Sequence, residues 1–221
     1  MAEDGAEHIG SALKASDVDA VASLFEICER PGARLDVKQL APIAPLLAPS
    51  GAIGRIATRF GEGPMRPVRA ILLDKSPVTN WSLAWHQDRV IAVQERHETP
   101  GFANWSTKNG VTHVQAPEEL MARMLTLRVH VDPVDESNAP LLILPGSHRL
   151  RTLSEGEIQR LALRAPHAAC LAGRGDVWVY HTPIIHSSGQ QRHDGHRKVL
   201  QIDYASFDLP GRLRWAYANL H

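Results

Sequence analysis

A histidine and an aspartate separated by one residue, in His86-Gln87-Asp88, are the residues whose types and spacing point most directly to chemistry. Alternate residues of a β-strand point to the same face of a sheet, so this imidazole and this carboxylate can reach one metal ion. With one further histidine they would occupy one side of the ion and leave positions open. That arrangement suits Fe(II), which can then take up a bidentate co-substrate and dioxygen. The pattern predicts a metal centre.

The dyad and its third ligand each have a second candidate. His130-Val131-Asp132 repeats the spacing on another expected strand. His181 competes with His186, because both follow the apolar run 177–180. A single His-x-Asp is also common as two polar residues on a solvated strand face. The spacing alone leaves these alternatives open.

Two arginines could bind a co-substrate carboxylate, since Arg192 follows His181 at the same distance at which Arg197 follows His186. Arg197 begins the run 197–204, which predicts a strand. A strand holds an arginine rigidly enough for a bidentate contact with a carboxylate. Arg192 lies among glycines, glutamines and charged residues, where a solvated turn is expected. The local context favours the pair His186 and Arg197.

Helical signals dominate the first 65 residues and strand signals dominate the rest. Ser16 is expected to cap a helix from Asp17 to about Glu29, with a second helix starting near Asp36 and a third over Ile53 to Phe60. Strands are expected at eight short apolar runs: 68–73, 83–87, 90–94, 124–131, 141–144, 168–171, 177–180 and 199–204. Segment 97–117 has no convincing period, and we expect a functional loop such as a lid.

These elements predict a mainly β fold with flanking helices. The expected architecture is a double-stranded β-helix, the cupin-like jelly roll, with a helical N-terminal region. The length of 221 residues fits a single domain, in which residues 1–65 are mostly helical and residues 66–210 form the jelly-roll core.

The composition argues against several classes of protein. Lysine plus arginine and aspartate plus glutamate each number 24, so no net positive charge favours a nucleic-acid partner. The uncharged stretch 40–54 is short and interrupted by prolines, and the acidic N-terminus precedes no apolar signal segment. Cys28 and Cys170 fit neither a zinc site nor a disulfide framework. We therefore expect a cytoplasmic protein without a nucleic-acid or membrane partner, and no feature of the sequence indicates an oligomeric state.

From about Leu72 to Ala205 the chain resembles the phytanoyl-CoA dioxygenase family, a branch of the iron- and 2-oxoglutarate-dependent oxygenases. Several motifs stand in the family's order: Asp74-Lys75-Ser76-Pro77, Asn80-Trp81, Trp85-His86-Gln87-Asp88, Leu127-Arg128-Val129-His130-Val131-Asp132, Pro145-Gly146-Ser147-His148, Gly175-Asp176, and His186-Ser187-Ser188 with Arg197. The chain departs from the family at Asn138-Ala139-Pro140, where Asn-Gly is frequent. We expect this departure to change a turn and not the metal site.

The resemblance implies which candidates hold the metal. It places Fe(II) on His86, Asp88 and His186 and makes His130-Val131-Asp132 a strand without ligands. Related halogenases replace the carboxylate with a small residue to admit chloride. Because Asp88 is present, the resemblance favours hydroxylation, while desaturation and ring formation begin from the same hydrogen abstraction.

The resemblance also implies a co-substrate site. 2-Oxoglutarate would chelate the iron, with its distal carboxylate paired to Arg197 and hydrogen-bonded by Ser188. Lys75, before the dyad, is a further candidate for the co-substrate or an anionic substrate. Dioxygen would take the last position, and oxidative decarboxylation would give succinate and carbon dioxide while a C–H bond of a small-molecule substrate is hydroxylated.

The sequence indicates the substrate-binding residues less clearly than the metal ligands. Trp105, Lys108 and His113 lie in segment 97–117, and Arg128 projects from an expected core strand, so we regard all four as candidates. A different reading is a jelly-roll metal-binding protein without 2-oxoglutarate turnover, either a cupin-like isomerase or a non-catalytic binding protein. Arg197 and Ser188 discriminate, because a site without a distal carboxylate has no use for them.

Overall fold

The fold was obtained as a computed structural model, which describes residues 1, 3–28, 32–192 and 194–220. Three antiparallel sheets make up the β-structure. The main sheet has the order β1 (Ala6–Ile9), β11 (Val177–His181), β8 (Leu125–His130), β13 (Arg197–Ala205), β3 (Arg66–Lys75) and β2 (Ala33–Arg34). The second has the order β10 (Ala168–Cys170), β9 (Leu141–Ile143), β12 (His186–Ser188) and β4 (Leu83–His86). The third comprises β5 (Val90–Val93), β7 (Val111–Gln115) and β6 (Ala103–Lys108).

The main sheet is buried on both faces, and alternation assigns the faces different chemistry. Ala70 and Leu72 of β3, like Leu200 and Ile202 of β13, belong to one large apolar cluster. Residues that alternate with these along the strands, such as Arg69 and Gln201, line a cavity between the main and second sheets. Successive strand residues point to opposite faces, so the main sheet has an apolar outer face toward the helices and a polar inner face toward the cavity.

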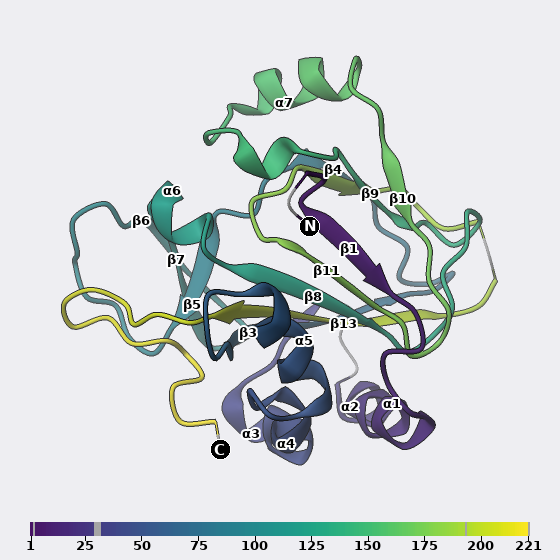
Figure 1. Cartoon of the computed structure of the whole chain (residues 1–221), viewed down its shortest axis with the longest axis horizontal. Helices are drawn as coiled ribbons and strands as arrows, with labels where there is room; N and C mark the ends of the chain where they lie inside the picture. Colours follow the sequence, from purple (N-terminus) through teal and green to yellow (C-terminus); the bar gives the residue numbers. More distant parts are fainter. Residues whose placement is uncertain (2, 29–31, 193, 221) are drawn as a thin grey trace.

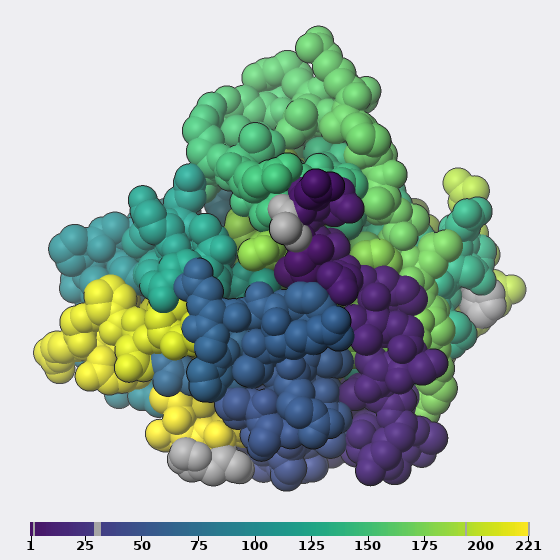
Figure 2. Space-filling view, in the orientation of Figure 1, coloured from purple at the N-terminus to yellow at the C-terminus, as the bar shows by residue number. Residues whose placement is uncertain are grey.

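Short N-terminal helices cover the apolar face, as Figure 1 and the blue and purple surface of Figure 2 show. They are α1 (Ala15–Ala22), α2 (Leu24–Ile27), α3 (Val37–Leu40), the 3₁₀ turn η1 (Ala41–Ile43), α4 (Ala44–Leu47) and α5 (Ala52–Phe60). Val21, Leu40 and Ile53 are fully buried against the sheet. The remaining helical elements are α6 (Glu118–Met121), η2 (Ser147–Arg149) and α7 (Glu155–Ala162).

The predicted jelly roll with flanking helices is confirmed, and all eight expected strands are present with ends shifted by a few residues. The helices expected near Asp36 and over Ile53 to Phe60 are also present. Asp36 forms a reciprocal capping box with Gln39, which explains why a helix starts there.

Two expectations were wrong, and two strands in the helical N-terminal part were not anticipated. Ser16 does not cap the first helix, because Lys14 holds the cap position, and the helix stops at Ala22; Glu29, its expected end, lies outside the described residues. The N-terminal part also contributes strands β1 and β2 to the main sheet. Segment 97–117 is not a loop but carries the hairpin β6–β7. Its turn is Asn109-Gly110, both with positive φ (52° and 75°), the pair that favours a tight hairpin turn.

Within the part of the chain that the structure describes, no single helix has the length and apolar character to cross a membrane. The helical segments Val37–Leu47 and Ala52–Phe60 reach that length and apolar character only when they are taken together, and they are bent by 72° relative to each other.

Candidate metal centre

Strands β4 and β12 are neighbours in the second sheet, and their register places His86 opposite His186. The two imidazole rings lie 4.2 Å apart between centroids. Asp88 follows just beyond the end of β4, so its carboxylate reaches the same point. One ligand atom from each of the three residues lies within 4.8 Å of the others. This is the only group of three or more potential ligand residues found among the described residues.

Both histidines present an unprotonated nitrogen to this point. Nδ1 of His86 donates to the carbonyl oxygen of Ala84 at 2.8 Å, and Nδ1 of His186 donates to that of Ile184 at 2.9 Å. A carbonyl can only accept, so the proton sits on Nδ1 and the Nε2 lone pair is left for a metal. Burial, and then the neighbouring His86, lower the pKa of His186 to about 4, which keeps this ring neutral.

Arg69 of β3 fixes the carboxylate of Asp88. Its Nη2 lies 3.2 Å from Asp88, and its Nε donates at 2.6 Å to Asp203, which is fully buried on β13. Burial, the largest influence, would raise the pKa of Asp88, but the charge and hydrogen bond of Arg69 and the two histidines together outweigh it, so the pKa lies below its ordinary value. Thr126 donates to Asp203 at 2.9 Å, so Asp88 is held through a buried network in the main sheet.

A second group of charges, Lys75, Arg128 and Arg197, lies in the same cavity. All three side chains are at least 97% buried, and among the described residues none forms an ion pair with a carboxylate. Lys75 Nζ donates to Ser188 Oγ at 2.8 Å and to the carbonyl of Gly189, and Arg128 donates to Gln201 at 2.9 Å. Nε of Arg128 and Nε of Arg197 are buried without a hydrogen-bond partner.

The electrostatic cost of this cluster is visible in the pKa values. Burial, then the charges of Arg197 and Arg128, lower the pKa of Lys75 to about 7. Burial, then Arg128, lower the pKa of Arg197 to about 9. Buried cations are normally paired, and these three form no ion pair with a carboxylate among the described residues, so together they offer a site for an anion.

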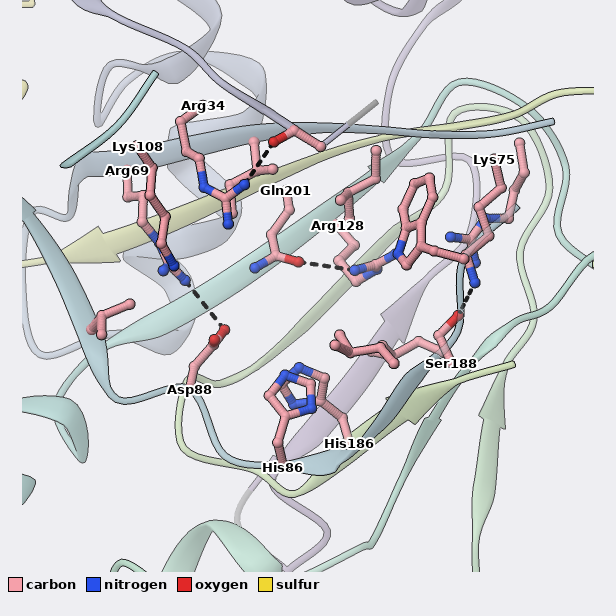
Figure 3. A pocket seen from close by; sticks show the side chains of 18 residues that line it. Arg34, Arg69, Lys75, His86, Asp88, Lys108, Arg128, His186, Ser188 and Gln201 are labelled. Carbon is pink, nitrogen blue, oxygen red and sulfur yellow. Dashed lines mark hydrogen bonds and ion pairs between the residues drawn. The ribbon is translucent and has the colours of Figure 1, made fainter. Parts of the chain in front are cut away.

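The cavity that holds both groups has a volume of about 270 Å³ and opens between the two sheets. Figure 3 shows His86, His186 and Asp88 at one side, with Lys75 and Ser188 at one end and Arg34, Arg69 and Lys108 at the other. A metal at the triad would face the space between the ends. The donor set of two neutral imidazoles and one carboxylate fits Fe(II), and the anion site fits an acidic co-substrate.

Ala139 corrects one expectation about the turn that departs from the family pattern. Its φ is +58°, the left-handed region in which glycine is favoured, which accounts for the frequent glycine there. Its carbonyl oxygen accepts hydrogen bonds from Ser188 at 3.3 Å and from Arg197. The departure therefore touches the anion site and not only an outer turn.

The competing candidates lie elsewhere. His130 is buried on the inner face of β8 with both ring nitrogens unpaired, and Asp132 accepts from the backbone of Lys198 at 2.9 Å. His181 stacks on His148 at 4.7 Å. Arg192 is exposed, as expected for a solvated turn.

The four substrate candidates divide into two pairs. Lys108 and Arg128 line the cavity, whereas Trp105 and His113 do not. Trp105 packs with the apolar residues around β5, and Arg96 lies over its ring at 5.5 Å. His113 is fully buried, which lowers its pKa to about 4.

Sequence reasoning missed Arg34 and Arg69, which both line the cavity. Alternation along β3 places residue 69 on the same face as Lys75, and that periodicity could have found it. Arg34 lies on a two-residue strand that has no periodic signal.

Comparisons with known proteins concern the family and the fold of the chain. A family model described as phytanoyl-CoA dioxygenase (PhyH) matches residues 1–199. No curated protein matches the chain.

Three solved structures illustrate the structural likeness. The 2-oxoglutarate-dependent epimerase SnoN from nogalamycin biosynthesis has a TM-score of 0.69 at 19% identity, over 96% of this chain and 85% of its own. The carbocyclase SnoK of the same biosynthesis has a TM-score of 0.68 at 19% identity, over 94% and 81%. HygX from Streptomyces hygroscopicus, solved with nickel and 2-oxoglutarate, has a TM-score of 0.65 at 13% identity, over 96% and 87%. At these identities the likeness concerns the fold.

Proposed function

The chain belongs to the phytanoyl-CoA dioxygenase family, and on that premise we propose that it is an Fe(II)- and 2-oxoglutarate-dependent dioxygenase that hydroxylates an unactivated C–H bond of a small molecule. The observation that carries the proposal is the buried, acid-free cluster of Lys75, Arg128 and Arg197 in the same cavity as the His86, Asp88 and His186 triad. A metal site alone would not need these cations.

In this proposal His86, Asp88 and His186 hold the iron, whose bound form couples decarboxylation of 2-oxoglutarate with dioxygen to C–H oxidation. In the balanced reaction, one substrate C–H group, one dioxygen and one 2-oxoglutarate give one alcohol, one succinate and one carbon dioxide. His86 lies on β4, His186 on β12 and Asp88 just beyond the end of β4, so the three side chains would hold the metal from one side of the cavity.

The chain's own residues supply position and a dry site. Strand β13 holds Arg197 so that its planar guanidinium faces the distal carboxylate of 2-oxoglutarate. Ser188 and Lys75, which are hydrogen-bonded to each other, bind the same end of the co-substrate. Lys75 in its charged form adds to the attraction of the dianion. The two sheets exclude water, which strengthens each of these contacts.

Hydroxylation is proposed over halogenation because Asp88 occupies the carboxylate position that halide would need. SnoK is a carbocyclase and SnoN is an epimerase, so the architecture also accommodates other outcomes in those proteins. The mass of the product discriminates. A hydroxylated product gains one oxygen atom, a cyclised product loses two hydrogens, and an epimer keeps its mass.

The test is a metabolite screen for succinate formation above the substrate-free background, with Fe(II) and 2-oxoglutarate in air. The wild type and His130→Ala should form succinate, while His86→Ala should not, because two protein ligands hold Fe(II) poorly against water. Mass spectrometry of the stimulating metabolite should then show the gain of one oxygen. A product of unchanged mass, or equal succinate formation by His86→Ala, would contradict the proposal.

A further inference from the structure

The cavity has a second cationic end that the co-substrate does not use. Arg34, Arg69 and Lys108 line it on the side away from Lys75, with Asp88 paired to Arg69 at this end and His86 nearer the middle (Figure 3). A 2-oxoglutarate molecule that chelates the metal and reaches Arg197 extends toward the Lys75 end. The opposite end is therefore open to another molecule.

Among the described residues, two of these three cations form no ion pair with a carboxylate. Arg69 is committed to Asp88 and Asp203. Arg34 is half-buried, and within the described residues its one hydrogen bond from the side chain is from Nη1 to the carbonyl of Gly32 at 2.8 Å. Its Nε is buried without a partner. Lys108 is exposed at the rim, and none of the ion pairs among the described residues includes it.

Different elements bring these charges together, which implies that the fold holds them at one place. Arg34 lies on β2, paired opposite Ile71 of β3, and Lys108 ends β6 at the hairpin turn. Asn109, the next residue, lines a surface hollow together with Arg34, so the hairpin tip lies beside β2. Burial, then the charge of Arg69, lower the pKa of Arg34, and the charge of Asp88 offsets this only in part.

The charge balance favours an anion at this end. Arg34, Arg69, Lys75, Lys108, Arg128 and Arg197 line the cavity against one lining carboxylate, Asp88. Iron would add two positive charges and 2-oxoglutarate two negative ones, so the surplus remains with both bound. A cavity with low-dielectric walls focuses such a surplus on an incoming ligand.

We propose that Arg34, assisted by Lys108, binds an oxyanion of the substrate, a carboxylate or a phosphate. Ile71 and Val90 also line the cavity, so the substrate combines this anionic group with an apolar body. The guanidinium offers a planar fork to the oxyanion, and Lys108 attracts it from the rim. The anchored group would position a C–H bond before the triad. This inference rests on the proposed function for the place of the co-substrate.

The test uses three probes with one apolar body: 3-phenylpropionate, 3-phenylpropyl phosphate and the neutral 3-phenylpropanol. Each is titrated by anaerobic calorimetry into protein loaded with Fe(II) and saturating 2-oxoglutarate. At least one anionic probe should bind wild type at least about tenfold more tightly than the alcohol. Whether the carboxylate or the phosphate is preferred identifies the oxyanion.

The variants locate the site. Arg34→Gln should remove the anion preference, Arg34→Lys should retain part of it, and Lys108→Gln should weaken anion binding several-fold in a salt-dependent manner. Arg192→Gln, which removes an exposed arginine outside the cavity, is the matched control and should behave as wild type.

Titration of 2-oxoglutarate alone separates the two proposals. Its affinity should be equal in wild type and Arg34→Gln, and failure to bind wild type would refute the proposed function. In that case the anion site is tested by comparing the affinity of the anionic probes for wild type and for Arg34→Gln without co-substrate. Equal binding of alcohol and anions, absence of binding by all three probes, or anion binding unaffected by Arg34→Gln would overturn the anion site. So would a loss of 2-oxoglutarate affinity in Arg34→Gln.

Discussion

Arg69 is the residue that connects Asp88 to the core of the main sheet. One guanidinium contacts two carboxylates, Asp88 at 3.2 Å and Asp203 at 2.6 Å. Partners behind a metal ligand fix its orientation and commonly change metal affinity by 10- to 100-fold when removed. Arg69 therefore belongs to the proposed metal centre as a positioning residue.

Arg69→Lys should lower Fe(II) affinity by about tenfold while the protein remains folded, because an ammonium keeps the charge but cannot span two carboxylates with a planar fork. Anaerobic calorimetry with Fe(II) measures this. Arg66→Lys, on the same strand and paired with the exposed Asp208, is the control and should bind iron as wild type does. Unchanged affinity in Arg69→Lys would show that Asp88 is positioned without it.

Lys75 gives the co-substrate site a dependence on pH. The pKa of Lys75 is lowered to about 7 by burial, Arg197 and Arg128, so the lysine is largely neutral above that pH in the free protein. A bound dianion favours the charged form and raises the pKa. Binding should therefore take up a proton above pH 7 and none well below it, and affinity for 2-oxoglutarate should fall as pH rises from about 7 to 9.

Calorimetry at pH 8 in buffers of different ionisation enthalpy counts that proton. Wild type should take up close to one proton on binding, and Lys75→Met should take up almost none and show a flatter pH profile. Proton uptake that is the same in both proteins would contradict the role of Lys75.

At the residue scale the sequence predicts the ligand types but not their selection. His86 and His130 have the same spacing to an aspartate, and both lie on strands. They differ in the strand that lies beside each of them in the sheet. β4 lies beside β12, which carries His186, whereas β8 lies in the other sheet. Pairing between distant strands is a property of the fold, so here only the family resemblance could anticipate it.

Among the elements, apolar strands were predictable and polar ones were not. β8 and β13 are buried and carry apolar residues at alternate positions, and both were expected. β12 consists of His186, Ser187 and Ser188, which have low strand propensity, and it exists because β4 and β9 pair with it on both sides. The polar hairpin β6–β7 was missed although its Asn109-Gly110 turn is a strong local signal.

The junction of α4 and α5 gives a stability prediction at this scale. A methyl group at Gly54 would lie 1.9 Å from the carbonyl oxygen of Ala48 and 2.6 Å from that of Leu47. In an open helix, alanine would stabilise by about 1 kcal/mol relative to glycine. Here the obstacle is backbone, so Gly54→Ala should instead lower the free energy of unfolding by about 1–3 kcal/mol.

Urea denaturation measures the change. Gly10→Ala, where a methyl group meets no atom within 4 Å, is the control and should change stability little. A more stable Gly54→Ala protein would show that α4 and α5 can separate at low cost.

In the molecule as a whole, the main sheet separates two tasks. Its outer face packs on the helices and supplies the apolar core, while its inner face carries Lys75, Arg128 and Arg197, which form no ion pair with a carboxylate among the described residues. Buried, unpaired cations cost stability, and replacing such ions with apolar residues is often neutral or stabilising. These three cations are therefore a cost in stability that a bound anion relieves.

Ligand-free Arg197→Met should consequently unfold at the same temperature as wild type or at a higher one. Iron with 2-oxoglutarate at about a hundredfold its dissociation constant should stabilise wild type by about 2.7 kcal/mol, and this gain should be absent in the variant. Thermal unfolding with and without the ligands measures both effects. A strongly destabilised variant would instead assign Arg197 a structural role.

The most direct test of the central claim, that Arg197 anchors 2-oxoglutarate beside a metal held by His86, Asp88 and His186, is anaerobic calorimetry of 2-oxoglutarate binding to the Fe(II)-loaded protein. Removing one partner of a buried charged pair costs about 2–5 kcal/mol, so Arg197→Ala should raise the dissociation constant at least about tenfold with iron binding unchanged. Arg192→Ala, at an exposed position, should bind as wild type does. Failure of wild type to bind 2-oxoglutarate, or equal binding by Arg197→Ala, would contradict the account.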